Sequence, residues 1–149
     1  MLSVNNMYSN QAQLLELQLC DLEYIKDLDC DGFSACTAYL LKRASVSYRL
    51  MRGQCIRVST GHIIVPHYWI ELSPDACAYL QHTNDQLVID FNLRKWLFED
   101  EEVPHGVFAK NRETDFRYIG EAIDTDFGLD FWDLDSMTNG RLARMQINI

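Results

Sequence analysis

Three residues of the chain carry side chains that could together activate a thiol. Cys30 occurs in Leu-Asp-Cys-Asp-Gly-Phe, His67 in Pro-His-Tyr-Trp-Ile-Glu-Leu, and Asp90 in Leu-Val-Ile-Asp-Phe. A cysteine becomes a nucleophile when a base takes its proton, and an imidazole serves as that base when a carboxylate or amide fixes its tautomer. The trio therefore supplies one residue for each role and favours attack on an amide or ester carbonyl.

Two helices are expected in the first part of the chain, and the second would position the cysteine. Apolar residues recur with helical spacing over residues 9–26 and again over 32–43. Cys30 would then lie just before a helix N-terminus, where free N–H groups and the helix dipole favour a thiolate and could bind an oxyanion. Asp29 and Asp31 oppose this effect, because negative neighbours disfavour a second negative charge.

Alternating patterns predict strands that would hold the other two groups. They cover residues 46–50, 55–58, 62–72, 87–91, 105–108 and 116–119. Gly53, between the first two stretches, is expected to form a turn or a bulge. Pro66 cannot donate to a ladder, so a central strand is expected to begin after it. On that strand His67, Trp69 and Glu71 share one face, which would make Trp69 a shielding residue at the substrate site.

Asp90 is unexpected inside an apolar strand, because a buried carboxylate is costly without a partner. It could orient His67 from a neighbouring strand, or it could cap the turn at Asn92. The residues leave both roles open. The other histidines, His62, His82 and His105, lie before the strand, in a polar loop and in a turn, so each is a weaker candidate for the base.

The order of the elements predicts one α+β domain over residues 1–149, with helices first and an antiparallel sheet after them. Aromatic residues in the tail, over residues 124–135, could dock on this domain. The chain holds five cysteines, an odd number without Cys-x-x-Cys spacing, which favours a reduced, cytoplasmic protein. Cys36 falls on the apolar stripe of the second helix and is expected to be buried, as a core cysteine usually is.

Composition narrows the range of partners. The net charge of −9 argues against nucleic acid and against an anionic membrane surface. The sequence has neither a signal-peptide pattern at its start nor an apolar run of about 18 residues, so no membrane association is expected. The trio requires no metal or cofactor, and its partners would be a peptide, a protein side chain or a small amide or ester. Nothing in the sequence indicates an oligomeric state.

Two stretches resemble known thiol enzymes. Asp29-Cys30-Asp31-Gly32-Phe33 resembles the Asp-Cys-Ser-Gly nucleophile motif of NlpC-type peptidases, and the segments 67–72 and 88–91 resemble the His-x-Trp-x-Glu-Leu … Ile-Asp pattern of transglutaminase-like proteins. Both groups belong to the papain-like superfamily. The resemblance implies a papain-like core with Cys30 as nucleophile, His67 as base and Asp90 as orienter. It departs from the pattern at Asp31, where a serine is usual, and at Tyr24, where papain-type enzymes place an oxyanion glutamine.

Two other functions fit the same stretch. A degenerate member of the papain-like fold would be a binding or inhibitory protein without catalysis. Alternatively, Asp27, Asp29 and Asp31 with Gly32 resemble the metal-binding segment of DHH phosphoesterases. That family needs a strand leading into the motif and a later Asp-His-His, and the sequence has neither.

Overall fold

The computed structural model describes residues 4–25, 28–80, 85–123 and 127–149, with side chains from Gln11 onward. Its elements are, in chain order, α1 (Val4–Glu23), α2 (Cys30–Arg43), β1 (Tyr48–Arg57), β2 (His62–Leu72), α3 (Pro74–Tyr79), β3 (Leu87–Asp90), α4 (Leu93–Trp96), β4 (Gly106–Ala109), the short 3-10 helix η1 (Lys110–Arg112), β5 (Phe116–Ala122), α5 (Phe131–Met137) and η2 (Leu142–Arg144). The class is therefore α+β, as the order of patterns predicts.

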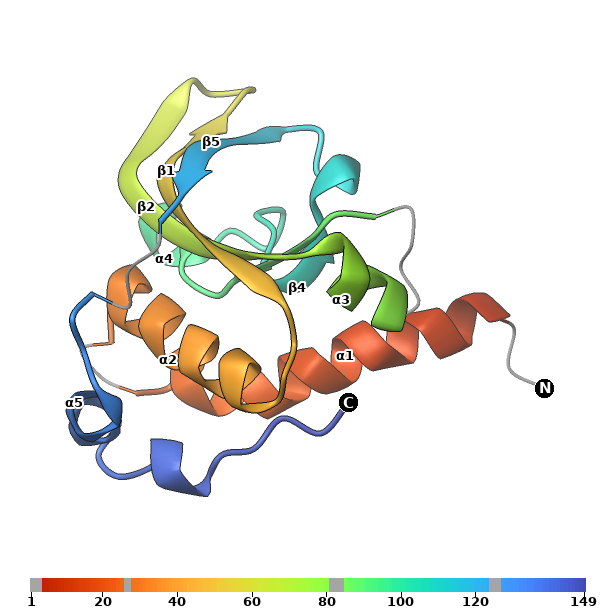
Figure 1. The fold of residues 1–149 in the computed structure, drawn as a ribbon. Coiled ribbons are helices and arrows are strands. Elements are labelled where there is room, and N and C mark those ends of the chain that lie inside the picture. Colours follow the sequence, from red (N-terminus) through yellow and green to blue (C-terminus); the bar gives the residue numbers. More distant parts are fainter. Residues whose placement is uncertain (1–3, 26–27, 81–84, 124–126) are drawn as a thin grey trace.

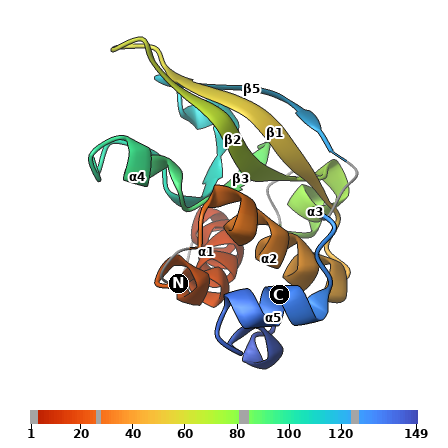
Figure 2. The same ribbon diagram turned by 90° about the vertical axis from the view of Figure 1, so that its left-hand side faces the viewer.

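The five described strands form one sheet in the order β4-β3-β2-β1-β5. Every neighbouring pair is antiparallel. Helices α1, α2 and α5 lie on one side of this sheet, and the β1–β2 hairpin projects from the body of the molecule (Figures 1 and 2). The strands expected to carry His67 and Asp90 are therefore neighbours, β2 and β3.

Each face of the sheet covers its own apolar core. Between helices and sheet, Leu41 of α2 packs in one cluster with Ile70 and Leu72 of β2. On the opposite face a second cluster contains Trp69 and Tyr118. The period of two along a strand sends alternate side chains of β2 into the two clusters, which is why this strand is buried on both faces near its end.

Two strands differ from the sequence prediction. β1 joins the two predicted stretches into one strand through Gly53, so of the two alternatives at that residue the bulge is confirmed and the turn is wrong. β2 runs through Pro66, although the prediction starts the central strand after that residue. The pairing of β1 with β2 shifts register between Gly53 and Cys55, opposite the Val65–Pro66 segment. A register shift leaves one residue outside the ladder, so a proline without an N–H is accommodated there.

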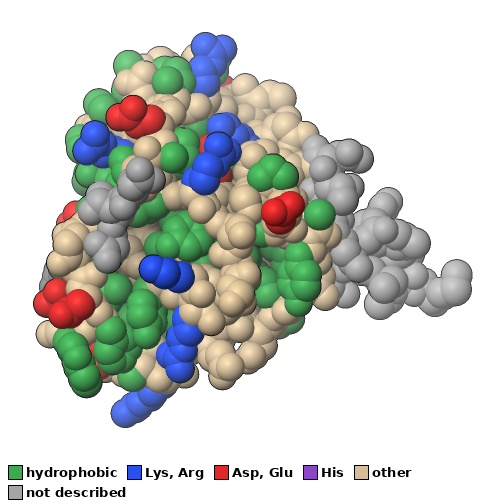
Figure 3. Space-filling view, viewed as in Figure 1, with side chains coloured by type: hydrophobic (Ala, Val, Ile, Leu, Met, Phe, Trp, Pro, Cys, Tyr) green, Lys and Arg blue, Asp and Glu red, His purple; other side chains and the backbone are tan. Residues whose placement is uncertain are grey.

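The aromatic residues of the tail are only partly docked. Phe131 packs against Tyr39 of α2 with ring centroids 5.5 Å apart, and Phe127 contacts Tyr68 at 5.2 Å. Residues 124–126 of the predicted tail lie outside the described residues. Trp132 of α5 keeps 75% of its surface exposed. Figure 3 shows hydrophobic side chains gathered at the surface where α5 lies, with Lys and Arg side chains scattered singly across the same face. In the described part of the chain, the helices are too short or too polar to cross a bilayer.

Candidate active site

Cys30 is the first residue of α2, two residues earlier than the start predicted for that helix. Asp29 is the N-cap residue, but its side chain makes no capping hydrogen bond. The Asp31 carboxylate accepts from the N–H of Gly32 at 2.8 Å, and the N–H of Phe33 donates to the Asp29 carbonyl. Among the described residues, the N–H groups of Cys30 and Asp31 have no partner. The thiol therefore lies beside two backbone donors that remain available to an oxyanion.

His67 and Asp90 form a buried pair between β2 and β3. The distance from His67 Nε2 to Asp90 Oδ2 is 2.7 Å, and both side chains are fully buried. The same Oδ2 accepts the hydroxyl proton of Tyr118 at 2.9 Å. A carboxylate oxygen accepts only, so Nε2 of His67 must carry a proton. The other ring nitrogen, Nδ1, is buried without a hydrogen-bond partner.

Asp90 makes the hydrogen bonds that both of its predicted roles require, with one oxygen for each. Oδ2 faces His67 and Tyr118, whereas Oδ1 accepts from the N–H groups of Asn92 and Leu93 at 3.0 and 3.2 Å. With the bonds from His67 and Tyr118, Asp90 accepts four hydrogen bonds, and it is only 2% exposed. This carboxylate therefore fixes the imidazole and the start of α4 at the same time, and its burial is compensated by hydrogen bonds.

The charges around the imidazole favour its protonated form. Burial alone lowers the pKa of His67, but the charge and hydrogen bond of Asp90, together with the Cys30 thiol, outweigh it and raise that pKa to about 10. The Cys30 thiol contributes to the raised pKa of His67, although Nδ1 of His67 has no hydrogen-bond partner. Because Asp90 occupies Nε2, the nitrogen left for the thiol is Nδ1. Such contacts are often long in free enzymes and shorten when substrate binds.

Trp69 shields the pair but does not reach the substrate side. Its ring stacks on His67 with centroids 5.9 Å apart, and it is 1% exposed. The geometry is compatible with the predicted shielding role, and the buried ring does not line the groove. Trp69 Nε1 donates to Glu71 Oε2 at 3.0 Å, and Lys110 and Arg49 pair with the same carboxylate at 3.1 Å. These bonds hold the indole in place under the imidazole.

Tyr118 of β5 belongs to the site, and the sequence gives only a weak signal for it. The alternation of Phe116 and Tyr118 predicts an inward-facing pair, but not that β5 joins the sheet beside β1 and reaches Asp90. Burial and the Asp90 charge raise the pKa of Tyr118 well above its ordinary value, so its hydroxyl stays a donor. We therefore identify Tyr118 as a residue that positions Asp90.

Tyr118→Phe is expected to lower the free energy of unfolding by about 2 kcal/mol, because it removes a buried hydrogen bond to a charged group. The rate of Cys30 alkylation should fall a few-fold, since Asp90 loses one of the bonds that fix its oxygen. Tyr79→Phe is the matched control: its hydroxyl donates to the Ile149 carbonyl at 2.7 Å, but the residue is 64% exposed. Equal losses of stability in the two variants, measured by urea unfolding, would contradict the role of Tyr118.

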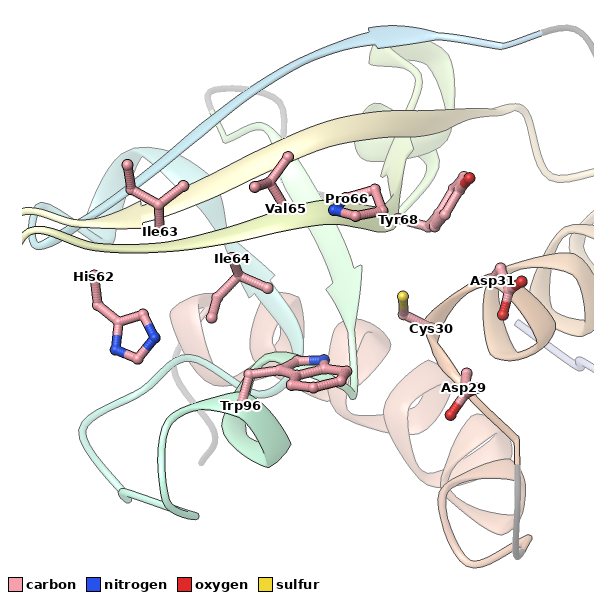
Figure 4. A pocket seen from close by; sticks show the side chains of 10 residues that line it. All are labelled: Asp29, Cys30, Asp31, His62, Ile63, Ile64, Val65, Pro66, Tyr68 and Trp96. Carbon is pink, nitrogen blue, oxygen red and sulfur yellow. The ribbon is translucent and has the colours of Figure 1, made fainter.

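A groove of about 470 Å³ opens onto Cys30. One side is the run of β2 from His62 to Pro66 together with Tyr68, and the other carries Trp96 of α4. Figure 4 shows Cys30 at one end of the groove, with its sulfur directed toward β2, and His62 at the far end. Of the candidate trio only Cys30 lines the groove, because the side chains of His67 and Asp90 are fully buried.

The remaining cysteines and histidines are placed elsewhere. Cys36 is fully buried, as predicted, and burial raises the pKa of the Cys36 and Cys55 thiols to about 12. Cys77 is buried in α3. His105 lies outside the helices and strands and is partly buried, and its Nε2 pairs with Glu23 Oε1 at 2.6 Å. His82 lies outside the described residues.

The phosphoesterase alternative finds no support in the part of the chain that the structure describes. There, no group of three or more His, Cys, Asp or Glu side chains is arranged to hold a metal ion. Asp29 and Asp31 flank the start of α2, where negative charges stabilise the helix dipole. Asp27, the third carboxylate of that hypothesis, lies outside the described residues.

Comparisons with protein families, with curated proteins and with solved structures give no match for this chain.

Proposed function

We propose that the protein is a cysteine-dependent hydrolase or acyltransferase of papain-like, transglutaminase-like type that acts on an amide or ester carbonyl. Cys30 is the nucleophile, His67 the general base and acid, and Asp90 the group that orients His67. The observation that carries the proposal is the buried 2.7 Å bond between His67 and Asp90, next to a thiol at a helix start. The first two N–H groups of that helix have no partner among the described residues.

The reaction needs no group beyond these residues. The Cys30 sulfur, its proton held by His67 Nδ1, attacks the carbonyl carbon and pushes an electron pair onto the carbonyl oxygen. The N–H groups at the start of α2 bind that oxyanion. When the carbonyl reforms, the leaving amine or alcohol departs with the proton from Nδ1 and a thioester remains. Water or an acceptor amine then gives its proton to Nδ1, attacks the thioester and releases the Cys30 sulfur.

Selective alkylation tests the proposal before any substrate is known. Iodoacetamide near pH 7 should label Cys30 ahead of Cys20, as measured by mass spectrometry of the digested protein. Cys20 is the matched control because it has the same intermediate exposure and also has acidic neighbours. Cys36 should stay unlabelled, since a buried thiol with a raised pKa is inert.

A second experiment distinguishes activation of the thiol by His67 from simple exposure of the thiol to the reagent. His67→Gln keeps a polar side chain of similar size but cannot take a proton, so Cys30 should then react within a few-fold of Cys20. A His67→Gln variant that keeps its fold, judged by circular dichroism, and alkylates at the wild-type rate would exclude the triad. Cys30 no faster than Cys20 in the wild type would favour the inactive, binding form of the fold.

A further inference from the structure

The strand that leads to Cys30 has one side without a partner strand. β2 pairs with β1 from His62 to Leu72, but β3 pairs with β2 only at Ile70 and Glu71. In the described part of the chain, no strand and no backbone hydrogen bond occupies the other side of β2 between His62 and Tyr68. Alternate residues of such a stretch direct their N–H and C=O groups toward the open side.

This open edge coincides with the groove. The groove-lining residues of β2 run consecutively from His62 to Pro66, and Tyr68 follows beside Cys30. At the rise of a β-strand, residues 62–68 extend over about 20 Å. Trp96, which is 55% exposed, lines the groove from α4 and offers an aromatic surface facing the strand.

The open edge of β2 also lacks the charged side chains that usually protect an unpaired strand edge. Residues 62–68 include no Lys, Arg, Asp or Glu, and Ile63 and Val65 remain 50% and 63% exposed. Proteins normally blunt an open edge with charges, because bare backbone groups and β-branched side chains recruit other strands. Pro66 removes a single donor, and the rest of the stretch stays free to pair.

We propose that the groove binds an extended segment of polypeptide as an added strand on β2, with its reacting carbonyl delivered to the Cys30 end. This inference rests on the proposed function and names its substrate class: a peptide main chain of about four to five residues, rather than a small amide. Main-chain hydrogen bonds would supply most of the recognition, and Trp96 would pack on the side chains that point away from β2.

Reactive peptides test this directly. The probes are a Thr-Val-Thr-Val-Thr peptide with a chloroacetyl group at its N-terminus and a second with a chloroacetamidoethyl amide at its C-terminus, which samples the reverse chain direction. At equal low concentration, one of them should alkylate Cys30 at least about tenfold faster than chloroacetamide and with saturation. The same peptide N-methylated at alternate amides should lose this advantage, because it cannot form the ladder.

Matched variants locate the binding. Trp96→Ala should reduce the advantage of the peptide reagent over chloroacetamide. Trp132→Ala, which removes an exposed tryptophan of α5 outside the groove, should change neither rate. Equal rates for the methylated and unmethylated peptides would overturn the proposal. So would a Cys30 alkylation rate that falls as protein concentration rises, since that would assign the open edge to a second copy of the chain.

A non-reactive readout keeps this inference separate from the proposed function. The acetylated form of the same peptide should shift the backbone amide resonances of residues 62–68 in a ¹⁵N spectrum of the full chain, and the Cys30→Ala variant should give the same shifts. Shifts along β2 together with an inert Cys30 would support the groove and reject catalysis. A reactive Cys30 without shifts along β2 would reject the groove alone.

Discussion

Asp90→Asn is expected to slow alkylation of Cys30 by about a hundredfold while leaving the fold intact, because an amide cannot replace both of the carboxylate's functions. In the native protein the two oxygens accept four hydrogen bonds, two on each oxygen. An asparagine has one accepting oxygen. If that oxygen faces His67, the amide NH₂ meets the N–H groups of Asn92 and Leu93; if it faces them, the NH₂ meets Nε2–H of His67.

In either orientation the asparagine lacks the negative charge that keeps the imidazole of His67 protonated. The pKa of His67, raised to about 10 in the native protein, should therefore fall, because burial then acts without the opposing charge of Asp90. Below about pH 10 the native imidazole therefore carries both protons, whereas the imidazole of the variant loses one of them at a lower pH. Ring ¹⁵N shifts of His67, followed from about pH 5 to 10 beside the alkylation rate, check both effects. An unchanged titration in Asp90→Asn would show that the carboxylate only caps the turn.

Gly53→Ala should destabilise the protein by about 3 kcal/mol or more, one of the largest effects expected from a single methyl group. Gly53 lies opposite His67 on one side and opposite Gly120 on the other. A Cβ at this position would overlap the Ile119 carbonyl oxygen and lie 2.5 Å from the Gly120 Cα. Both contacts are with backbone, so no side chain can rotate away to relieve them.

Gly32→Ala is the matched control for that substitution. Its Cβ would lie 2.9 Å from Leu28 Cδ1 and 2.9 Å from Met137 Cε, the mobile ends of two side chains. Because alanine also favours a helix, the net change should stay within about 1 kcal/mol. Urea unfolding of the two variants measures the difference. A Gly53→Ala protein as stable as Gly32→Ala would mean that β1 and β5 separate more easily than their pairing indicates.

The sequence predicts the positions of the site well where local pattern decides them. The polar break before Gly32 predicts a helix start within two residues of Cys30, and alternation on β2 places His67 and Trp69 on one face. Both follow from periodicity, which acts over a few residues. The pairing of β2 with β3 is also suggested locally, because an aspartate inside an apolar strand needs a partner.

What the sequence does not predict depends on contacts between distant segments. Tyr118 reaches Asp90 only because β5 crosses to the far side of β1, and no local pattern encodes that strand order. The break in pattern at Gly53 fits either a turn or a bulge, and only the pairing with β2 shows that it is a register shift within one strand. The fixing of Trp69 by Glu71 likewise needs Lys110 and Arg49 from two other segments.

Asp90 bonds both to His67 and to the start of α4, and this links the proton affinity of His67 to the affinity of the groove for a ligand. One oxygen holds the imidazole, and the other holds the first residues of the segment that carries Trp96 into the groove wall. Any ligand that displaces this wall must strain the bonds to Oδ1 and thereby change the environment of Oδ2. By thermodynamic reciprocity, the protonation of His67 then changes ligand affinity by the same factor as the ligand changes proton affinity. Filling the groove would therefore be accompanied by uptake or release of a fraction of a proton.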